Sequence, residues 1–218
     1  MSHAEARMAI DAGAWALGLV AEMPSGVGPI PDEHIANIAA AVPRGIETFL
    51  LTSRTDAKGI IEHQKLCGTT TVQMVDHVPH ATLTGIRDAL PGIRLVQVIH
   101  VNGSSSVEEA AAVAPLVDMI LLDSGKPDAD IRTLGGTGDT HDWNLSLEIR
   151  RRVAIPVFLA GGLNPGNAGD AIRRVQPFGV DLCSGIRTDG QLDPSKLEAF
   201  FSAVNRVPRQ AAARDQRT

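Results

Sequence analysis

The chain has 218 residues, of which 44% are hydrophobic, and this apolar content excludes intrinsic disorder as a description of the whole. Lys and Arg number 20 against 25 Asp and Glu, for a formal net charge of −5, and aromatic residues make up only 3%. Nucleic-acid-binding proteins need a basic surface and aromatic stacking platforms, and anionic membranes attract basic ones. We therefore expect neither a nucleic acid nor a membrane as a partner.

The N-terminus lacks the pattern of a signal peptide, and no apolar run approaches the roughly 20 residues of a membrane span. Cys67 and Cys183 are far apart and form no CxxC pair, so the spacing indicates neither a zinc site nor a disulfide framework. These features predict a soluble cytoplasmic protein with reduced thiols.

Short apolar runs alternate with amphipathic stretches along the chain, which opens in a helical pattern over residues 4–12. The predicted strands are residues 16–21, 47–51, 71–75, 95–101, 119–123, 156–160 and 179–183. The helices predicted between and after them are residues 32–41, 57–65, 83–90, 107–113, 146–152, 165–175 and 194–204. Each strand is apolar on both faces, which is typical of a parallel sheet covered on both sides.

Repeated β/α units of this size predict either a doubly wound sheet or a (β/α)8 barrel. A barrel has eight strands, so in that case the first strand would lie before Met1. We predict one domain over residues 1–206. Periodicity is lost after Arg206, and we expect residues 207–218 to form a disordered tail.

Three glycine-rich loops follow predicted strands in the second half of the chain: one contains Gly136 and Gly138, the next Gly161 and Gly162, and the last Ser184 and Gly185. Glycines at the carboxyl ends of strands let backbone N–H groups approach an oxyanion, and a following helix adds its positive N-terminal end. In barrels the phosphate site usually lies in the loops after the last two strands. We therefore predict a phosphate site there. The alternative is that the glycines serve only strained turns with positive φ.

Asp123 ends the apolar strand of residues 119–123, and this end of a parallel barrel is its catalytic face. Burial there raises a carboxyl pKa, which suits a general acid. The alternative is an aspartate that caps a helix or a turn.

With these residues in view, the chain resembles the phosphoribosylanthranilate isomerase family. The motifs that carry the resemblance are LLDS at 121–124, GGTGxxxDW at 135–143, FLAGGLNP at 158–165 and VDxxSG at 180–185. The resemblance implies a TIM-type (β/α)8 barrel, here without its first strand. It also implies an enzyme of tryptophan biosynthesis, an aldose–ketose isomerase that performs an Amadori rearrangement.

In that reaction a general base removes the C2′ proton of the phosphoribosylamine while a general acid protonates the ring oxygen and opens the sugar. By motif position Asp123 matches the general acid and Asp181 a substrate-facing carboxylate. Gly136, Gly138, Gly161, Gly162, Ser184 and Gly185 match the substrate and phosphate contacts. The resemblance implies a phosphoribosyl or other phosphorylated sugar substrate, no metal and no cofactor.

The chain departs from the family at two positions that bear on the chemistry. The family's first strand reads roughly KICG and its cysteine is the base, but this chain begins where that strand ends. An arginine that clamps the anthranilate carboxylate is also missing, because residues 24–29 read PSGVGP. A late start site, a shortened chain or a natural paralogue would each explain the missing strand. The alternative function is a non-catalytic or differently specific phosphosugar-binding paralogue, and for the chain as given we expect very low isomerase activity.

Two residues are candidates for a substitute base. Cys183 shares strand parity with Asp181 and is expected to point into the barrel, although a free cysteine usually serves as a small buried apolar residue. His100 ends a strand at the catalytic face, and its alternative is an ordinary hydrogen-bonded histidine. With seven strands, an open seam is expected between residues 16–21 and 179–183, whose unpaired edges favour a homo-oligomer or a substitute segment.

Overall fold

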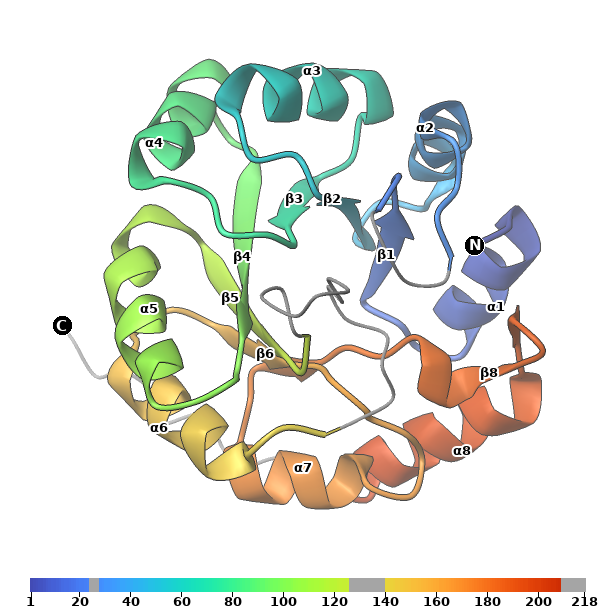
Figure 1. The fold of residues 1–218 in the computed structure, drawn as a ribbon. Coiled ribbons are helices and arrows are strands. Elements are labelled where there is room, and N and C mark those ends of the chain that lie inside the picture. The colour runs from blue at the N-terminus through green and yellow to red at the C-terminus, as the bar shows by residue number, and fades with distance from the viewer. Residues whose placement is uncertain (24–27, 126–139, 209–218) are drawn as a thin grey trace, which may run out of the picture.

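The computed structural model describes residues 1–23, 28–125 and 140–208. Seven parallel strands follow one another in chain order around a curled sheet, and the helices lie outside it (Figure 1). The strands are β1 (Ala16–Val20), β2 (Glu47–Thr52), β3 (Thr71–Met74), β4 (Arg94–His100), β5 (Met119–Asp123), β6 (Val157–Leu159) and β7 (Gly179–Val180). Of the two predicted folds, this order is that of the barrel, because the strand order of a doubly wound sheet reverses direction.

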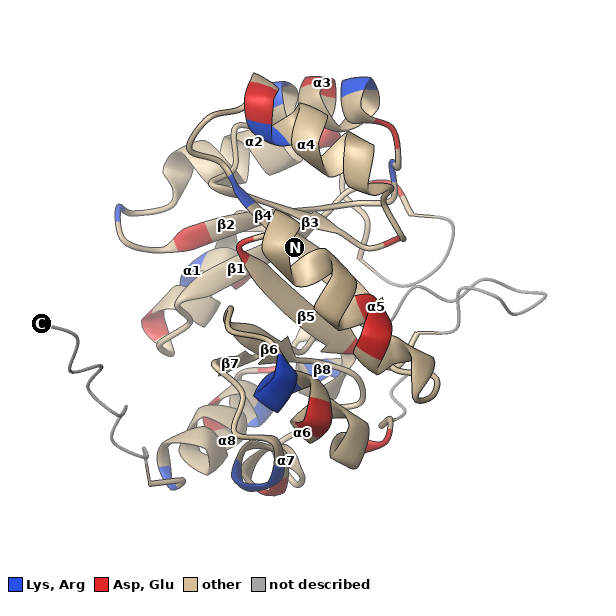
Figure 2. Ribbon diagram, turned by 90° about the vertical axis from the view of Figure 1, so that its left-hand side faces the viewer, with Lys and Arg blue, Asp and Glu red and all other residues tan. Residues whose placement is uncertain are grey.

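Every predicted helix is present, with shifts at the ends. The helices are α1 (His3–Asp11), α2 (Asp32–Ala41), α3 (Ala57–Cys67), α4 (His80–Ala89), α5 (Ser105–Val113), α6 (Trp143–Arg152), α7 (Ala168–Val175) and α8 (Pro194–Asn205), with the 3₁₀ turns η1 (Ala114–Leu116) and η2 (Ser184–Ile186). Charged residues of both signs lie along these outer helices (Figure 2). In the described part of the chain, none of the helices has the length and apolarity to cross a membrane. Most of the predicted tail, residues 209–218, lies outside the described residues.

Alternate residues of each strand face two different apolar layers, as the strand pattern predicts. On β4, Val96 and Val98 belong to the cluster inside the barrel, where they join Leu121 and Phe158. Leu95 and Ile99 belong to the layer between the sheet and the helices. His100 and Asp123 continue the inward series of β4 and β5, and the two residues are register partners. Strand parity therefore directs both side chains to the carboxyl-end mouth of the barrel.

The last predicted strand, residues 179–183, is too long: β7 ends at Val180. Beyond it one ladder bond remains, from the Asp181 N–H to the Leu159 carbonyl at 2.9 Å, before Cys183 turns the chain into η2. β7 is an edge strand, so its backbone is held from one side only. An edge strand without a second partner loses its extended form sooner than a central one.

A short antiparallel hairpin, β8 (Arg187–Thr188) and β9 (Gln191–Leu192), was not predicted. Asp189 and Gly190 join its strands, and both have positive φ, 50° and 77°. An Asp-Gly pair with two positive φ values is the preferred connection of a two-residue hairpin loop. The signal was therefore present in the sequence, but it lies between strands too short to show a periodic pattern.

The predicted seam is confirmed within the described residues, since β1 and β7 are the two ends of the sheet and do not pair with each other. α1 lies beside this seam, next to α8 and the hairpin (Figure 1). Its buried Ala6 and Ala9 pack in one apolar cluster with Leu197 and Phe200 of α8. α1 thus joins the beginning of the sheet to the last helix.

A partly buried ion pair fixes this junction. The Glu5 carboxylate accepts hydrogen bonds from the Arg187 guanidinium at 2.7 Å and from the Leu192 N–H at 2.9 Å, and a third from the Ser2 N–H that starts α1. Burial opposes the charge of Glu5, but these hydrogen bonds and the charge of Arg187 outweigh it and lower the pKa of Glu5 to about 2.

We predict that Glu5→Gln lowers the free energy of unfolding by about 2 kcal/mol at pH 7, because the partly buried Arg187 loses its counter-charge. The folded-state pKa of Glu5 lies below its ordinary value of 4.5. The stabilisation is therefore present above that pH and is lost as the pH falls toward 2. Urea unfolding at a series of pH values measures it.

Glu62→Gln is the matched control, because the exposed Glu62 only faces Lys58 at 3.9 Å. Such surface pairs contribute about 0–1 kcal/mol. Equal destabilisation by the two substitutions would contradict a special role for Glu5.

Candidate active site

Asp123 is buried at the end of β5, with 9% of its surface exposed. Its carboxylate accepts a hydrogen bond from the Ser124 N–H at 2.8 Å. Burial raises the pKa of Asp123, while this hydrogen bond and the neighbouring His100 oppose the rise. A carboxyl group whose pKa is raised by burial keeps its proton longer and is suited to proton donation.

Asp181 provides a second carboxyl group at the same mouth of the barrel as Asp123. Its residue is exposed to solvent, although protein atoms lie around its carboxyl group. These surroundings and the charge of Asp123 raise the pKa of Asp181 to about 6, against the effect of the Leu182 N–H. The two carboxyl groups thus interact, and each makes ionisation of the other less favourable.

The two described glycine loops meet beside Asp123. Gly161 and Gly162 have φ values of 79° and 63°, so both need the conformational freedom of glycine. A Cβ on Gly161 would lie 2.9 Å from the Ser124 nitrogen, and one on Gly185 would lie 2.0 Å from the Leu163 carbonyl oxygen. Backbone approaches this close leave no room for a side chain.

The two loops differ in the element that follows each of them. The Asn167 side chain donates to the Gly162 carbonyl at 2.9 Å, and α7 begins directly after Asn167. The helix that begins at Ser184 is the short 3₁₀ turn η2 rather than an α-helix. The β8–β9 hairpin that Glu5 holds follows it, and α8 begins only at Pro194. Gly136 and Gly138 lie outside the described residues.

The two candidate bases lie in different surroundings. Cys183 interacts with the guanidinium of Arg187, which is the partner of Glu5 at the seam. His100 Nε2 lies 2.9 Å from the Val75 carbonyl and donates to it, so in the neutral form of the ring Nδ1 carries the lone pair. Nδ1 is buried and has no hydrogen-bond partner among the described residues.

His141 is a mouth residue that the sequence analysis missed. Its Nε2 lies 2.7 Å from the Ser146 hydroxyl, and its Nδ1 lies 3.0 Å from the position of a Cβ on Gly161. Burial lowers the pKa of His141 to about 4, against the charge of Asp142, so the ring is neutral at pH 7. Its place between a glycine-rich loop and the Asp142 N-cap was the available sequence signal.

Comparisons with known proteins identify the family of this chain. Residues 49–203 match the family model described as N-(5'phosphoribosyl)anthranilate (PRA) isomerase. N-(5'-phosphoribosyl)anthranilate isomerase 2 of Methanosarcina mazei is 34% identical over 198 residues, which cover 90% of this chain and 87% of that protein. The isomerase of Methanocella arvoryzae is 31% identical, with 89% of each chain covered.

Among solved structures, phosphoribosyl anthranilate isomerase from Thermotoga maritima superposes with a TM-score of 0.80 at 26% identity, and the match covers 94% of this chain and 95% of that one. The matches span nearly the whole chain in both sequence and structure. The chain belongs to the N-(5'-phosphoribosyl)anthranilate isomerase family.

Proposed function

We propose that this chain catalyses the Amadori rearrangement of N-(5'-phosphoribosyl)anthranilate, a step of tryptophan biosynthesis. The observation that carries the proposal is the buried Asp123 carboxyl group, whose pKa burial raises, beside Asp181 at the barrel mouth. A non-catalytic paralogue is not favoured, because the relatives that match most of this chain bear the isomerase name.

In the proposed reaction Asp123 gives its proton to the ring oxygen as the bond from that oxygen to C1′ breaks. His100 Nδ1 removes the proton from C2′, and the resulting enolamine then ketonises. C2′ and the ring oxygen are both bonded to C1′, so an acid and a base at paired positions of β4 and β5 reach both atoms. Asp181 accepts hydrogen bonds from the sugar hydroxyls.

The phosphate would bind at Gly161, Gly162, Ser184 and Gly185. Glycine turns bring backbone N–H groups close to an anion without interference from side chains. The tight packing of Gly185 against Leu163 supports a single site shared by both loops. Gly136 and Gly138 remain proposed substrate contacts on the basis of the family motif.

We predict that Asp123→Asn lowers kcat by about 10²–10⁴-fold with a much smaller change in KM, because the amide cannot donate the proton. In the unsubstituted chain, kcat should fall as the pH rises through the raised pKa of Asp123, since only the protonated form donates. The change in anthranilate fluorescence during turnover measures both. Asp170→Asn, an exposed change on α7, is the control, and unchanged turnover in Asp123→Asn would refute the assignment.

A second prediction separates the candidate bases. His100→Asn should lower kcat at least 100-fold, whereas Cys183→Ala should leave it within about threefold, given the usual contribution of a general base. The same fluorescence assay applies, with circular dichroism to verify folding. The reverse ranking would transfer the role of base to Cys183.

The phosphate site is tested without turnover. Millimolar ribose 5-phosphate should shift the backbone amide signals of Gly161, Gly162, Ser184 and Gly185 in nuclear magnetic resonance spectra. Gly45 and Gly92 are internal controls, because they precede β2 and β4 at the opposite end of the barrel. Shifts confined to the control glycines, or none at all, would count against the site.

A further inference from the structure

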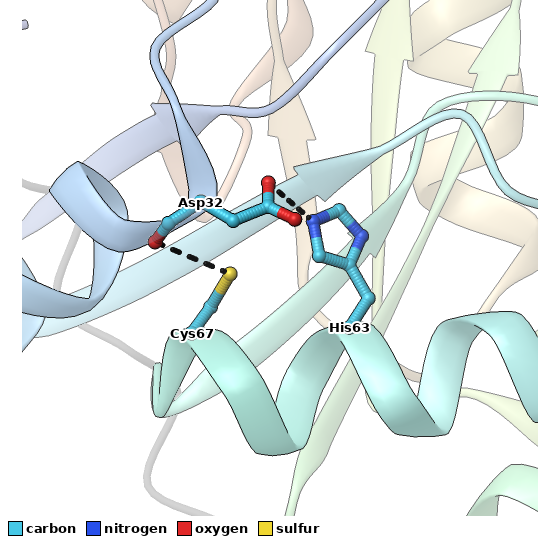
Figure 3. Close-up of side chains that lie close together, drawn as sticks. All are labelled: Asp32, His63 and Cys67. Atoms are coloured by element: carbon cyan, nitrogen blue, oxygen red, sulfur yellow. Dashed lines mark hydrogen bonds and ion pairs between the residues drawn. The ribbon is translucent and has the colours of Figure 1, made fainter.

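A second polar cluster lies between α2 and α3, outside the proposed catalytic groups. Asp32 is the first residue of α2, and His63 and Cys67 lie four residues apart on α3 and therefore share one helix face. Figure 3 shows the three side chains pointing toward one another. His63 and Cys67 are 3% and 1% exposed, whereas the Asp32 side chain is 28% exposed.

The distances within this cluster are short. His63 Nε2 lies 3.0 Å from Asp32 Oδ1, and Cys67 Sγ lies 3.9 Å from the Asp32 carbonyl oxygen. One ligand atom from each side chain lies within 4.8 Å of the other two. Ligands of a tetrahedral Zn²⁺ ion are about 3.3–3.8 Å apart, given bonds of about 2.0–2.3 Å. Small side-chain rotations therefore suffice to reach that geometry.

We propose that Asp32, His63 and Cys67 form a binding site for one divalent transition-metal cation such as Zn²⁺. Imidazole nitrogen, thiolate sulfur and carboxylate oxygen are the ligand types that Zn²⁺ takes in proteins. The carboxylate and the thiolate together neutralise the two positive charges of the ion. A neutral centre of this kind is compatible with the low exposure of His63 and Cys67.

The second ring nitrogen of His63, Nδ1, also has the hydrogen-bond partner that a metal-binding histidine needs. This nitrogen lies 3.1 Å from the hydroxyl of Thr52, a fully buried residue at the end of β2. When Nε2 binds the ion, the ring proton moves to Nδ1 and is donated to Thr52. Histidine ligands usually donate the second ring N–H in this way, which fixes the orientation of the ring.

An adjoining cavity of about 280 Å³ supplies the fourth coordination position. Asp32 and His63 line it together with Glu22 and Arg54, whereas Cys67 is not among the residues that line it. The ion would therefore carry a water molecule on the cavity side. On binding, the Cys67 thiol proton passes to solvent and the sulfur–metal bond forms, without any change of oxidation state.

Arg54 opposes the binding of a cation at this site. Its guanidinium lies 3.9 Å from Asp32 Oδ2 and donates to the Gly59 carbonyl at 3.1 Å. Like charges at such distances repel, so Arg54 lowers the affinity of the site. Arg54→Gln should consequently tighten Zn²⁺ binding, by about threefold or more.

The experiment titrates the full chain, freed of metal with a chelator, with Co²⁺ and then with Zn²⁺. Co²⁺ should bind one per chain and give a near-ultraviolet thiolate-to-cobalt band, and Zn²⁺ should displace it. Cys67→Ser should remove the band, whereas Cys183→Ser, the other thiol of the chain, should keep it. Asp32→Asn should weaken Zn²⁺ binding at least tenfold, and it leaves the buried face of α3 unchanged in case Cys67→Ser fails to fold.

Absence of the band in the unsubstituted chain would overturn the proposal, and so would a band that survives Cys67→Ser or disappears in Cys183→Ser. Zn²⁺ affinity unchanged by Asp32→Asn would also overturn it. His34→Asn controls for surface histidines, because the rings of His3 and His34 lie 5.5 Å apart, and it should leave the cobalt band intact. Loss of the band in that variant would assign binding to the surface pair.

Discussion

The Glu5–Arg187 ion pair bridges the open seam of this barrel, and the junction of the first helix with the β8–β9 hairpin depends on it. β1 and β7 end the sheet without pairing, so main-chain hydrogen bonds do not complete the ring of described strands. Glu5 binds both strands of the β8–β9 hairpin, through Arg187 and Leu192, and thereby joins residues more than 180 positions apart. A side-chain carboxylate thus supplies part of the long-range order that a sheet ladder usually provides. The same arrangement brings Cys183 beside Arg187 rather than leaving its thiol without a polar neighbour.

The chemistry of the barrel mouth follows from strand parity. Side chains at alternate positions fill the interior with apolar atoms, and where β4 and β5 end the same series continues as His100 and Asp123. Apolar residues beneath Asp123 and protein atoms around Asp181 disfavour the charged carboxylates, and their mutual repulsion adds to this effect. The pattern that fills the core therefore also sets the protonation of the groups above it.

Residues close in the sequence were easier to interpret than groups assembled from distant segments. His63 and Cys67 lie on one face of α3, but Asp32 belongs to a different helix, and only the packing of α2 on α3 brings it to them. The position of His141 was hard to predict for the same reason, because its neighbour Gly161 lies 20 positions further along the chain. Spacing arguments detect ligand sets within one segment, so they could not associate Asp32 with His63 and Cys67.

The sequence by itself determined the order and type of the main elements, the unpaired ends of the described sheet and the glycine turns. These depend on local periodicity and on backbone conformations that only glycine adopts readily. The tertiary structure decided where β7 ends, that a 3₁₀ turn and a hairpin rather than an α-helix follow Cys183, and that among the described residues His100 and His141 each carry a buried nitrogen without a partner. Each of these depends on whether a neighbouring segment supplies a hydrogen-bond partner. Such a partner is a property of the packed chain, and no local stretch of sequence contains it.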